Sequence, residues 1–265
     1  MKRLVTILII IMPFHLLGQD LKITYIANEG VLIANQNKKV LIDALFDDFY
    51  KQYLSPSAEA LSKMMASENP FDGVDVVLTT HFHRDHFEAN ITGNFLKEHQ
   101  ESALLSSNQI KDELQSKYVD YSSIEKRVKA HARGVSTLKE EINGVTVYSF
   151  FMYHAGGERT KSIENMGFIV EVGDKKILHL GDSDMNPERF REVDLAKYEI
   201  DIALVPYWYM TSDAGIDIIN NSIKPKQLIG VHYPKAPSKT ALDEIMKNYP
   251  KARVFKEAME SFSMK

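Results

Sequence analysis

Short apolar segments and amphipathic segments alternate along the chain, and turn residues separate them. Apolar runs of about four to eight residues are typical of buried strands, whereas apolar residues spaced three or four apart indicate helices. In the first half, this pattern predicts strands at residues 21–27, 31–34, 40–43, 74–78 and 103–105, and helices at 57–66, 88–99 and 109–117.

The second half repeats the alternation. We expect strands at 145–152, 202–205 and 227–231, and a hairpin of 167–172 with 176–180 around Gly173-Asp174. Helices are expected at 213–223 and at 238–247, the latter with Ser238 as its N-cap. Because no repeat, low-complexity run or flexible linker divides the chain, we predict one domain from residue 19 to residue 265.

Four polar residues lie at or just past the ends of predicted strands. They are His81, His154, Asp182 and His232. Strand ends and the loops that follow them are where a sheet scaffold presents its chemistry. The recurrence of this placement favours a functional site over packing alone.

The N-terminal segment has the layout of a secretory signal peptide over residues 1–18. Lys2 and Arg3 precede a short apolar run from Leu4 to Met12, and Gly18 is a small residue before Gln19. We therefore expect cleavage after Gly18 and a periplasmic or secreted protein. The apolar run is short for a membrane span, so no stable span is expected after cleavage. An uncleaved anchor and a buried first strand are the alternatives.

Composition narrows the chemistry. The 265 residues include 32 Lys and Arg against 36 Asp and Glu, for a net charge of −4. An acidic body is a poor match for a phosphate backbone, so we expect a small-molecule substrate and no nucleic acid partner. With no cysteine, any metal must be held by His, Asp or Glu. The sequence does not determine the oligomeric state.

A dense cluster of candidate metal ligands spans residues 81–86, read as His-Phe-His-Arg-Asp-His. Neutral imidazole is a common ligand for zinc and similar ions. His81 and His83 can face one ion, while Asp85 and His86 can face a second ion nearby. A metal-free histidine cluster on a surface loop is the alternative, and it would leave polar groups crowded without partners.

The segment Thr79 to His86 resembles the signature of the metallo-β-lactamase-fold hydrolases. Residues 40–43 resemble the family's early strand ending in Asp, and His154, Gly181-Asp182 and His232 follow in the family's order. The resemblance implies an α/β fold, a four-layer αββα sandwich of two mixed β-sheets flanked by helices. Residues 71–75 and 230–233 are most similar to the lactonase and phospholipase-D-like branch.

The resemblance also implies a complete binuclear site. His81, His83 and His154 would bind one divalent ion, Asp85, His86 and His232 would bind a second, and Asp182 would bridge them. Zn²⁺ is the expected ion, with Mn²⁺ or Fe²⁺ as alternatives. The lactamases commonly use a cysteine ligand and the oxygen-reducing relatives a Glu at position 83, so neither activity is expected here.

Two such ions can clamp and activate a shared water, and the resulting metal-bridged hydroxide attacks a carbonyl carbon or phosphorus. Asp85 and Asp182 are the residues expected to act in catalysis, and Asp85 lies beside the nucleophile. We therefore expect an exported binuclear metal-dependent hydrolase acting on an ester, lactone or phosphodiester. A non-catalytic metal- or ligand-binding protein of the same fold and a nuclease are the alternatives.

Further residues have less specific interpretations. Asp43 either accepts a hydrogen bond from a ligand imidazole or bonds loop amides. Residues Tyr207 to Met210 and 46–69 are candidate pocket walls, with core packing as the alternative for the aromatics. Tyr153 and Tyr233 are candidate oxyanion donors. His179 is expected to be a core histidine, and His99 and His131 are expected at the surface.

Overall fold

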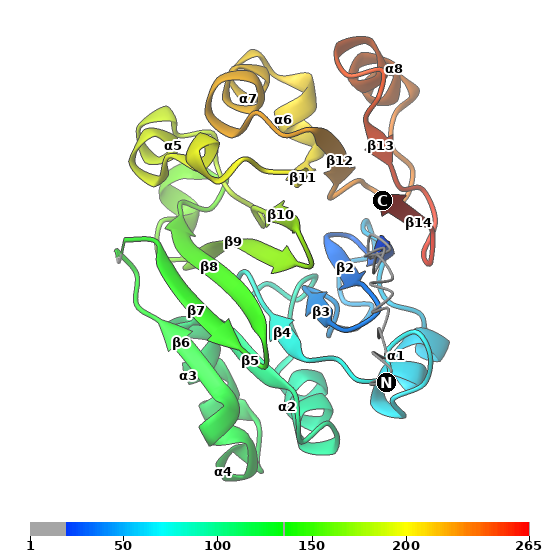
Figure 1. The fold of residues 1–265 in the computed structure, drawn as a ribbon, viewed down its shortest axis with the longest axis vertical. Coiled ribbons are helices and arrows are strands. Elements are labelled where there is room, and N and C mark those ends of the chain that lie inside the picture. The colour runs from blue at the N-terminus through cyan, green and yellow to red at the C-terminus, as the bar shows by residue number, and fades with distance from the viewer. Residues whose placement is uncertain (1–19, 135, 265) are drawn as a thin grey trace, which may run out of the picture.

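Two β-sheets lie face to face in the computed structural model, which describes residues 20–134 and 136–264 (Figure 1). In spatial order, the first sheet contains β14 (Ser261–Met264), β1 (Leu21–Ala27), β2 (Gly30–Ala34), β3 (Lys39–Ile42), β4 (Val76–Leu78), β5 (Ala103–Ser107) and β6 (Val128–His131). The second contains β13 (Arg253–Val254), β12 (Gln227–Val231), β11 (Ile202–Pro206), β10 (Lys175–His179), β9 (Asn165–Val172), β8 (Val145–Met152) and β7 (Leu138–Ile142).

Helices cover the outer faces of both sheets (Figure 1). On the first sheet these are α1 (Ala58–Met65), α2 (Ala89–Glu98), α3 (Asn108–Lys117) and α4 (Tyr121–Ile124), and on the second α5 (Pro187–Val193), α6 (Tyr207–Thr211), α7 (Asp213–Ile218) and α8 (Lys239–Asn248). Short helical turns are η1 (Glu125–Arg127), η2 (Gly157–Thr160), η3 (Leu195–Tyr198) and the π-helical η4 (Ile219–Ile223).

Three apolar cores hold these four layers together. One lies between the sheets and contains Val40 and Leu78 of the first sheet with Phe168 and Leu204 of the second. A second core joins the first sheet to α1–α4, and a third joins the second sheet to α5–α8. Alternate residues of a strand face opposite sides of a sheet, so strands buried on both faces read as nearly continuous apolar runs. The expected αββα sandwich of two mixed sheets is confirmed.

The parallel strands of each sheet bring several loops to one end. Strands β3 to β6 run parallel in the first sheet, as do β10 to β13 in the second. Each parallel strand therefore ends at the same edge of its sheet. The two edges meet where His232 N–H donates to Asn28 O at 3.1 Å and Met166 N–H donates to Thr80 O at 2.9 Å.

The predicted elements are present with small shifts at their ends. The hairpin of β9 with β10 is confirmed, and the Ser238 side chain caps α8 by accepting from Ala241 N–H. Tyr207 to Met210, for which no helix was predicted, form most of the short helix α6. Strands β6, β7, β13 and β14 and helices α4, α5 and α6 were not among the sequence expectations.

No helix within the described part of the chain is long and apolar enough to cross a membrane. The predicted signal peptide at residues 1–18 lies outside the described residues.

Candidate metal centre

The loop that follows β4 carries four of the predicted ligands. Backbone N–H groups of His86 and Phe87 both donate to His83 O, which folds residues 83–87 into a tight turn. The turn brings His81 and His86 onto one side with their ring centroids 4.1 Å apart. Before it, the Asp43 carboxylate accepts from Thr80 N–H at 2.8 Å and from Thr80 Oγ1–H at 2.6 Å, which fixes the start of the loop.

His81, His83, His154 and Asp182 form the first group of converging side chains. His154 Nε2 lies 3.3 Å from His81 Nε2 and 3.2 Å from His83 Nδ1, and the last two nitrogens are 3.0 Å apart. Nitrogen ligands about 2.0–2.1 Å from a tetrahedral zinc ion lie roughly 3.3 Å from one another. The three imidazoles are therefore spaced as ligands of one ion.

Asp85, His86 and His232 form the second group. His232 Nε2 lies 3.7 Å from Asp85 Oδ2, and His86 Nε2 lies 3.9 Å from the same oxygen. All three side chains are buried. The structure thus brings the predicted ligands together in the two groups expected from the sequence. That these residues bind metal stays a prediction.

Asp182 lies between the groups and turns one oxygen toward each. Its Oδ2 is 3.6 Å from His154 Nε2 and 3.9 Å from His81 Nε2, whereas its Oδ1 is 3.2 Å from His232 Nε2 and 3.3 Å from His86 Nε2. Asp182 Oδ1 and His232 Nε2 are buried without a hydrogen-bond partner among the described residues. Orphaned buried atoms of this kind are costly, and a pair of divalent cations would satisfy them.

Asp182 is positioned by hydrogen bonds between the loops that carry it and His154. Ala155 N–H donates to Asp182 O, and Asp184 N–H donates to Tyr153 O, both at 2.7 Å. Gly181 has φ +56°, and a Cβ there would lie 2.5 Å from Asn165 Oδ1 and 2.7 Å from Thr80 Cβ. The glycine is therefore required for the close approach that carries Asp182 to the ligands.

Hydrogen bonds behind the ligands fix which imidazole nitrogens face the centre. Asp43 Oδ2 accepts from His86 Nδ1–H at 2.9 Å while Oδ1 accepts from the loop amide of Thr80, so Asp43 fills both of the roles that were predicted as alternatives. Thr80 Oγ1 donates its proton to Asp43, so at 3.0 Å it accepts from His81 Nδ1–H. Both rings then turn Nε2 toward the other ligands, and Nε2 is the nitrogen left to bind a metal.

Burial and neighbouring charge set the protonation of the cluster. Burial lowers the pKa of His83 to about 4 and the pKa values of His81 and His154 in the same direction. Burial opposes the charge on His86, but the carboxylates of Asp182 and Asp85 outweigh it and raise the His86 pKa well above its usual value. Although burial acts in the opposite sense, His232 and His86 hold the pKa of Asp182 well below its ordinary range.

Three residues at the centre were missed by sequence reasoning. Asn28 Nδ2 lies 3.1 Å from Asp85 Oδ2, and the Tyr53 ring lies 4.5 Å from the His232 ring. Glu29 is fully buried, and burial followed by the charge of Asp182 raises its pKa well above the ordinary value. Asn28 and Glu29 form the turn between β1 and β2, where a polar pair between two apolar strands was the available signal.

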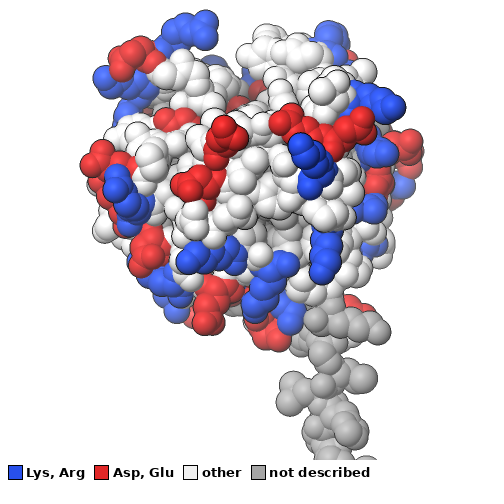
Figure 2. Space-filling view, turned by 90° about the horizontal axis from the view of Figure 1, so that it is seen from above, with Lys and Arg blue, Asp and Glu red and all other residues white. Residues whose placement is uncertain are grey.

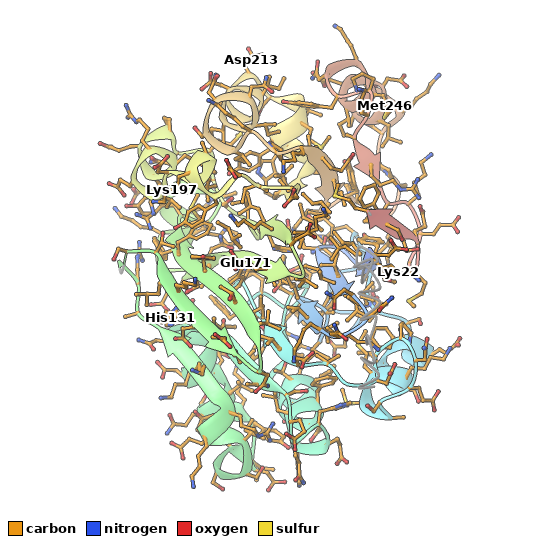
Figure 3. All side chains as sticks on the ribbon, viewed as in Figure 1. Lys22, His131, Glu171, Lys197, Asp213 and Met246 are labelled. Carbon is orange, nitrogen blue, oxygen red and sulfur yellow. The ribbon has the colours of Figure 1, made fainter. Side chains whose placement is uncertain are left out.

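The structure confirms the prediction for His179 and corrects the one for His131. His179 is a core histidine as expected, and its Nε2–H donates to Glu29 O at 3.0 Å. His131 lies on β6 (Figure 3). It is not at the surface, because it is buried between Ser149 and Glu140. His99 is half-buried, with its ring stacked on Phe95. The hydroxyl of Tyr233 lies against Met210 Sδ, and Tyr153 is 40% exposed.

Aromatic side chains and two hollows border the ligands. The Trp208 ring of α6 lies 5.1 Å from the His232 ring, measured between ring centroids. Tyr53, in the 46–69 segment, also packs on the His232 ring. A hollow of about 250 Å³ borders His83, between Tyr50 and Arg84 among others. A second hollow of about 250 Å³ borders His154.

The fold and this site place the chain in a family. The family described as a beta-lactamase superfamily domain matches residues 22–232, and the chain belongs to it. The chain is 25% identical over 223 residues to a UPF0173 metal-dependent hydrolase of Pyrococcus horikoshii, which covers 80% of this chain and 84% of the relative. The resemblance predicted from residues 79–86 is thereby confirmed.

Solved structures share the fold at low sequence identity. A possible metal-dependent hydrolase from Veillonella parvula has a TM-score of 0.67 and 17% identity, covering 92% of this chain and 99% of that one. A metallo hydrolase from the archaeon Ignicoccus hospitalis has a TM-score of 0.63 and 16% identity, covering 93% and 99%.

Proposed function

We propose that this chain is a metal-dependent hydrolase that holds two divalent ions, expected to be Zn²⁺, and cleaves an ester, lactone or phosphodiester. The observation that carries the proposal is the division of the Asp182 carboxylate, with Oδ2 toward His81 and His154 and Oδ1 toward His86 and His232. One carboxylate shared by two sets of imidazoles is the arrangement that a pair of bridged cations requires. The names of the relatives as metal-dependent hydrolases support the same activity.

The bound ions would supply Lewis acidity that activates water and polarises the substrate. The chain's own residues supply the rest. Asp85, beside the second group, is in position to orient the attacking water or to receive its proton. Tyr53 keeps its proton at neutral pH, because burial and then the Asp85 and Asp182 carboxylates raise its pKa. Its hydroxyl is therefore available to donate to an oxygen that gains charge.

The surroundings favour a small substrate with an apolar part. The two hollows beside His83 and His154 are each about 250 Å³, somewhat below the roughly 300–1,000 Å³ of typical small-molecule pockets, which favours a small substrate over a polymer. Tyr53 and Trp208 add apolar surface next to His232. Lys, Arg, Asp and Glu side chains are interspersed over the face drawn in Figure 2, which offers no continuous basic surface for nucleic acid.

Hydrolysis and metal dependence test the proposal together. The purified chain is assayed on a panel of p-nitrophenyl esters, lactones and a p-nitrophenyl phosphodiester, before and after removal of metal by a chelator. We expect turnover of at least one substrate class, loss on chelation and recovery on adding Zn²⁺. Metal bound without turnover on any panel member would instead favour the alternative of a metal- or ligand-binding protein.

We also propose that the protein is exported, since residues 1–18 carry the charged start and apolar run of a signal peptide. Cell fractionation followed by N-terminal sequencing tests this. The mature chain should begin at Gln19, and full-length protein in the cytoplasmic fraction would contradict export.

A further inference from the structure

We propose that Asn28, in the turn between β1 and β2, is a positioning residue for the second metal site. The proposal rests on the binuclear centre proposed above. Asn28 is fully buried, with 0% of its surface exposed, and lies against Asp85, His86 and His232. Asn28 is not itself a proposed ligand. It would hold two of the proposed ligands, Asp85 and His232, in place.

The Asn28 side chain fixes Asp85. Its Nδ2 lies 3.1 Å from Asp85 Oδ2 and 3.3 Å from Asp85 O, so one amide group donates to both the carboxylate and the backbone of the same residue. Asp85 Oδ2 is also the oxygen that faces His232 Nε2. The amide therefore orients the oxygen that this site would use.

The Asn28 backbone fixes His232. His232 has φ +61°, a left-handed conformation that costs a non-glycine residue about 1–2 kcal/mol. Its N–H donates to Asn28 O at 3.1 Å, and this bond joins the first sheet to the second. A strained ligand backbone is thus tied to the same residue that holds Asp85.

The local structure explains why an asparagine occupies this position. Asn28 itself has φ +48°, which asparagine and aspartate tolerate better than most residues. The register of β1 against β2 shifts between Tyr25 and Ala27, which redirects the chain before the turn. After the turn, Gly30 lets the backbone pack closely, since a Cβ there would lie 2.6 Å from Asp43 O.

The neighbouring residue Glu29 anchors the turn from its other side. Glu29 O accepts from His179 Nε2–H at 3.0 Å, and His179 Nδ1 accepts from Gly181 N–H at 3.2 Å. The turn is therefore linked to the loop that carries Asp182 as well as to His232. This double attachment explains how a single side-chain donor can be held rigidly at the second site.

Two substitutions separate donation by Asn28 from other roles. Asn28→Gly removes the side chain and tolerates the positive φ. Asn28→Asp keeps the shape but replaces the donor with an acceptor and sets a second carboxylate about 3.1 Å from Asp85. Asn143→Gly is the matched control, because Asn143 has φ +49° and its Nδ2 donates to Asp75 O and Glu101 O instead.

The experiment measures the affinity of each ion separately. Chelator-stripped native chain and variants are titrated with Zn²⁺ against a chromophoric chelator, and the Co²⁺-loaded forms are followed by their visible absorption. We expect Asn28→Gly to weaken one of the two ions, that of the second site, by about 10–100-fold and to leave the affinity of the other unchanged. Asn28→Asp should weaken the second-site ion further, and Asn143→Gly should match the native chain.

The outcomes distinguish this inference from the proposed function. If the native chain binds two ions and both Asn28 variants bind them equally well, Asn28 has no positioning role. If Asn28→Asp tightens the second ion, the residue at position 28 acts as an oxygen ligand and not as a donor, which overturns the assignment. A native chain that never takes up a second ion overturns the binuclear centre itself and this inference with it.

Discussion

The carboxylate of Asp43 lies 2.9 Å from Nδ1 of His86 and accepts its hydrogen bond, with both side chains fully buried. This contact selects the His86 tautomer that presents Nε2 to the second site. Asp43→Ala should therefore weaken the second ion by about 10–100-fold. The measurement is a Zn²⁺ titration of the chelator-stripped protein.

Asp201→Ala is the control for Asp43→Ala. Asp201, just before β11, is also buried. Its carboxylate accepts hydrogen bonds from the backbone N–H of Lys176 and from the side chain of Lys226. Its loss should lower stability and leave both metal affinities unchanged. Equal loss of the second ion in the two variants would show that general destabilisation, and not the tautomer, explains the effect.

Gly181→Ala should destabilise the chain more than Gly73→Ala. Both glycines have positive φ, +56° and +62°, so both alanines carry the cost of that conformation. At Gly73 nothing lies within 4 Å of a new Cβ, whereas at Gly181 the Cβ meets Asn165 and Thr80 below 3 Å. Overpacking of this kind costs about 1–3 kcal/mol in addition.

Urea unfolding of the two glycine variants measures the difference. We expect Gly181→Ala to show the lower midpoint and also weaker metal binding, because Asp182 is displaced with it. Identical midpoints would mean that the contact at Gly181 relaxes at no cost.

Tyr53→Phe should lower turnover by about tenfold or more and leave the metal content unchanged. Burial and then the charges of Asp85 and Asp182 raise the pKa of Tyr53, whose ring packs on His232, and its hydroxyl would donate to the reacting oxygen. Tyr233→Phe is the control, since the Tyr233 hydroxyl lies against Met210 Sδ. A Tyr53→Phe enzyme with native kcat would remove Tyr53 from the chemistry.

The metal-free protein should lose stability as the pH falls from about 6.5 toward 4. Burial lowers the pKa of several histidines, to about 4 for His83, so in this window the unfolded chain binds protons that the folded chain does not. Three groups act in the opposite direction: burial raises the pKa values of Glu29 and Asp184, and the carboxylates of Asp182 and Asp85 raise the pKa of His86 against the effect of burial. The histidines with lowered pKa values are His81, His83, His154 and His179.

Urea unfolding at pH 6.5, 5.5 and 4.5 checks the sign. We expect the midpoint to fall at each step, because the four histidines with lowered pKa values outnumber the three opposing groups. A midpoint that is flat or rises with acid would contradict the protonation states assigned to the cluster.

Much of the fold and the ligand set could be predicted because both depend on local sequence. Continuous apolar runs such as that of β11 mark strands buried on two faces, and His81, Asp182 and His232 each follow such a run. The spacing within residues 81–86 places several ligands in one loop whatever the rest of the chain does. These features need no knowledge of distant contacts.

The remaining features depend on contacts between residues far apart in the chain. Strand β14 pairs with β1, although residues 261–264 and 21–24 are far apart in the sequence. The short, half-exposed sequence of β14 gives little indication of a strand by itself. Helix α6 contains three aromatic residues with weak helix propensity, and it forms because Tyr209 and Met210 are buried in the third core. Asn28 joins the site through Asp85, His86 and His232, which lie far along the sequence.

The ratio of metal to protein tests the central claim, that Asp182 bridges two ions, most directly. Elemental analysis of Zn²⁺-saturated protein, after removal of free metal, should give two ions per native chain. The Asp182→Asn variant should bind at most one ion. Its turnover should also fall by more than the roughly 10–100-fold expected when a residue that only hydrogen-bonds to a metal ligand is lost. A native chain that retains one ion or none at saturation would contradict the account.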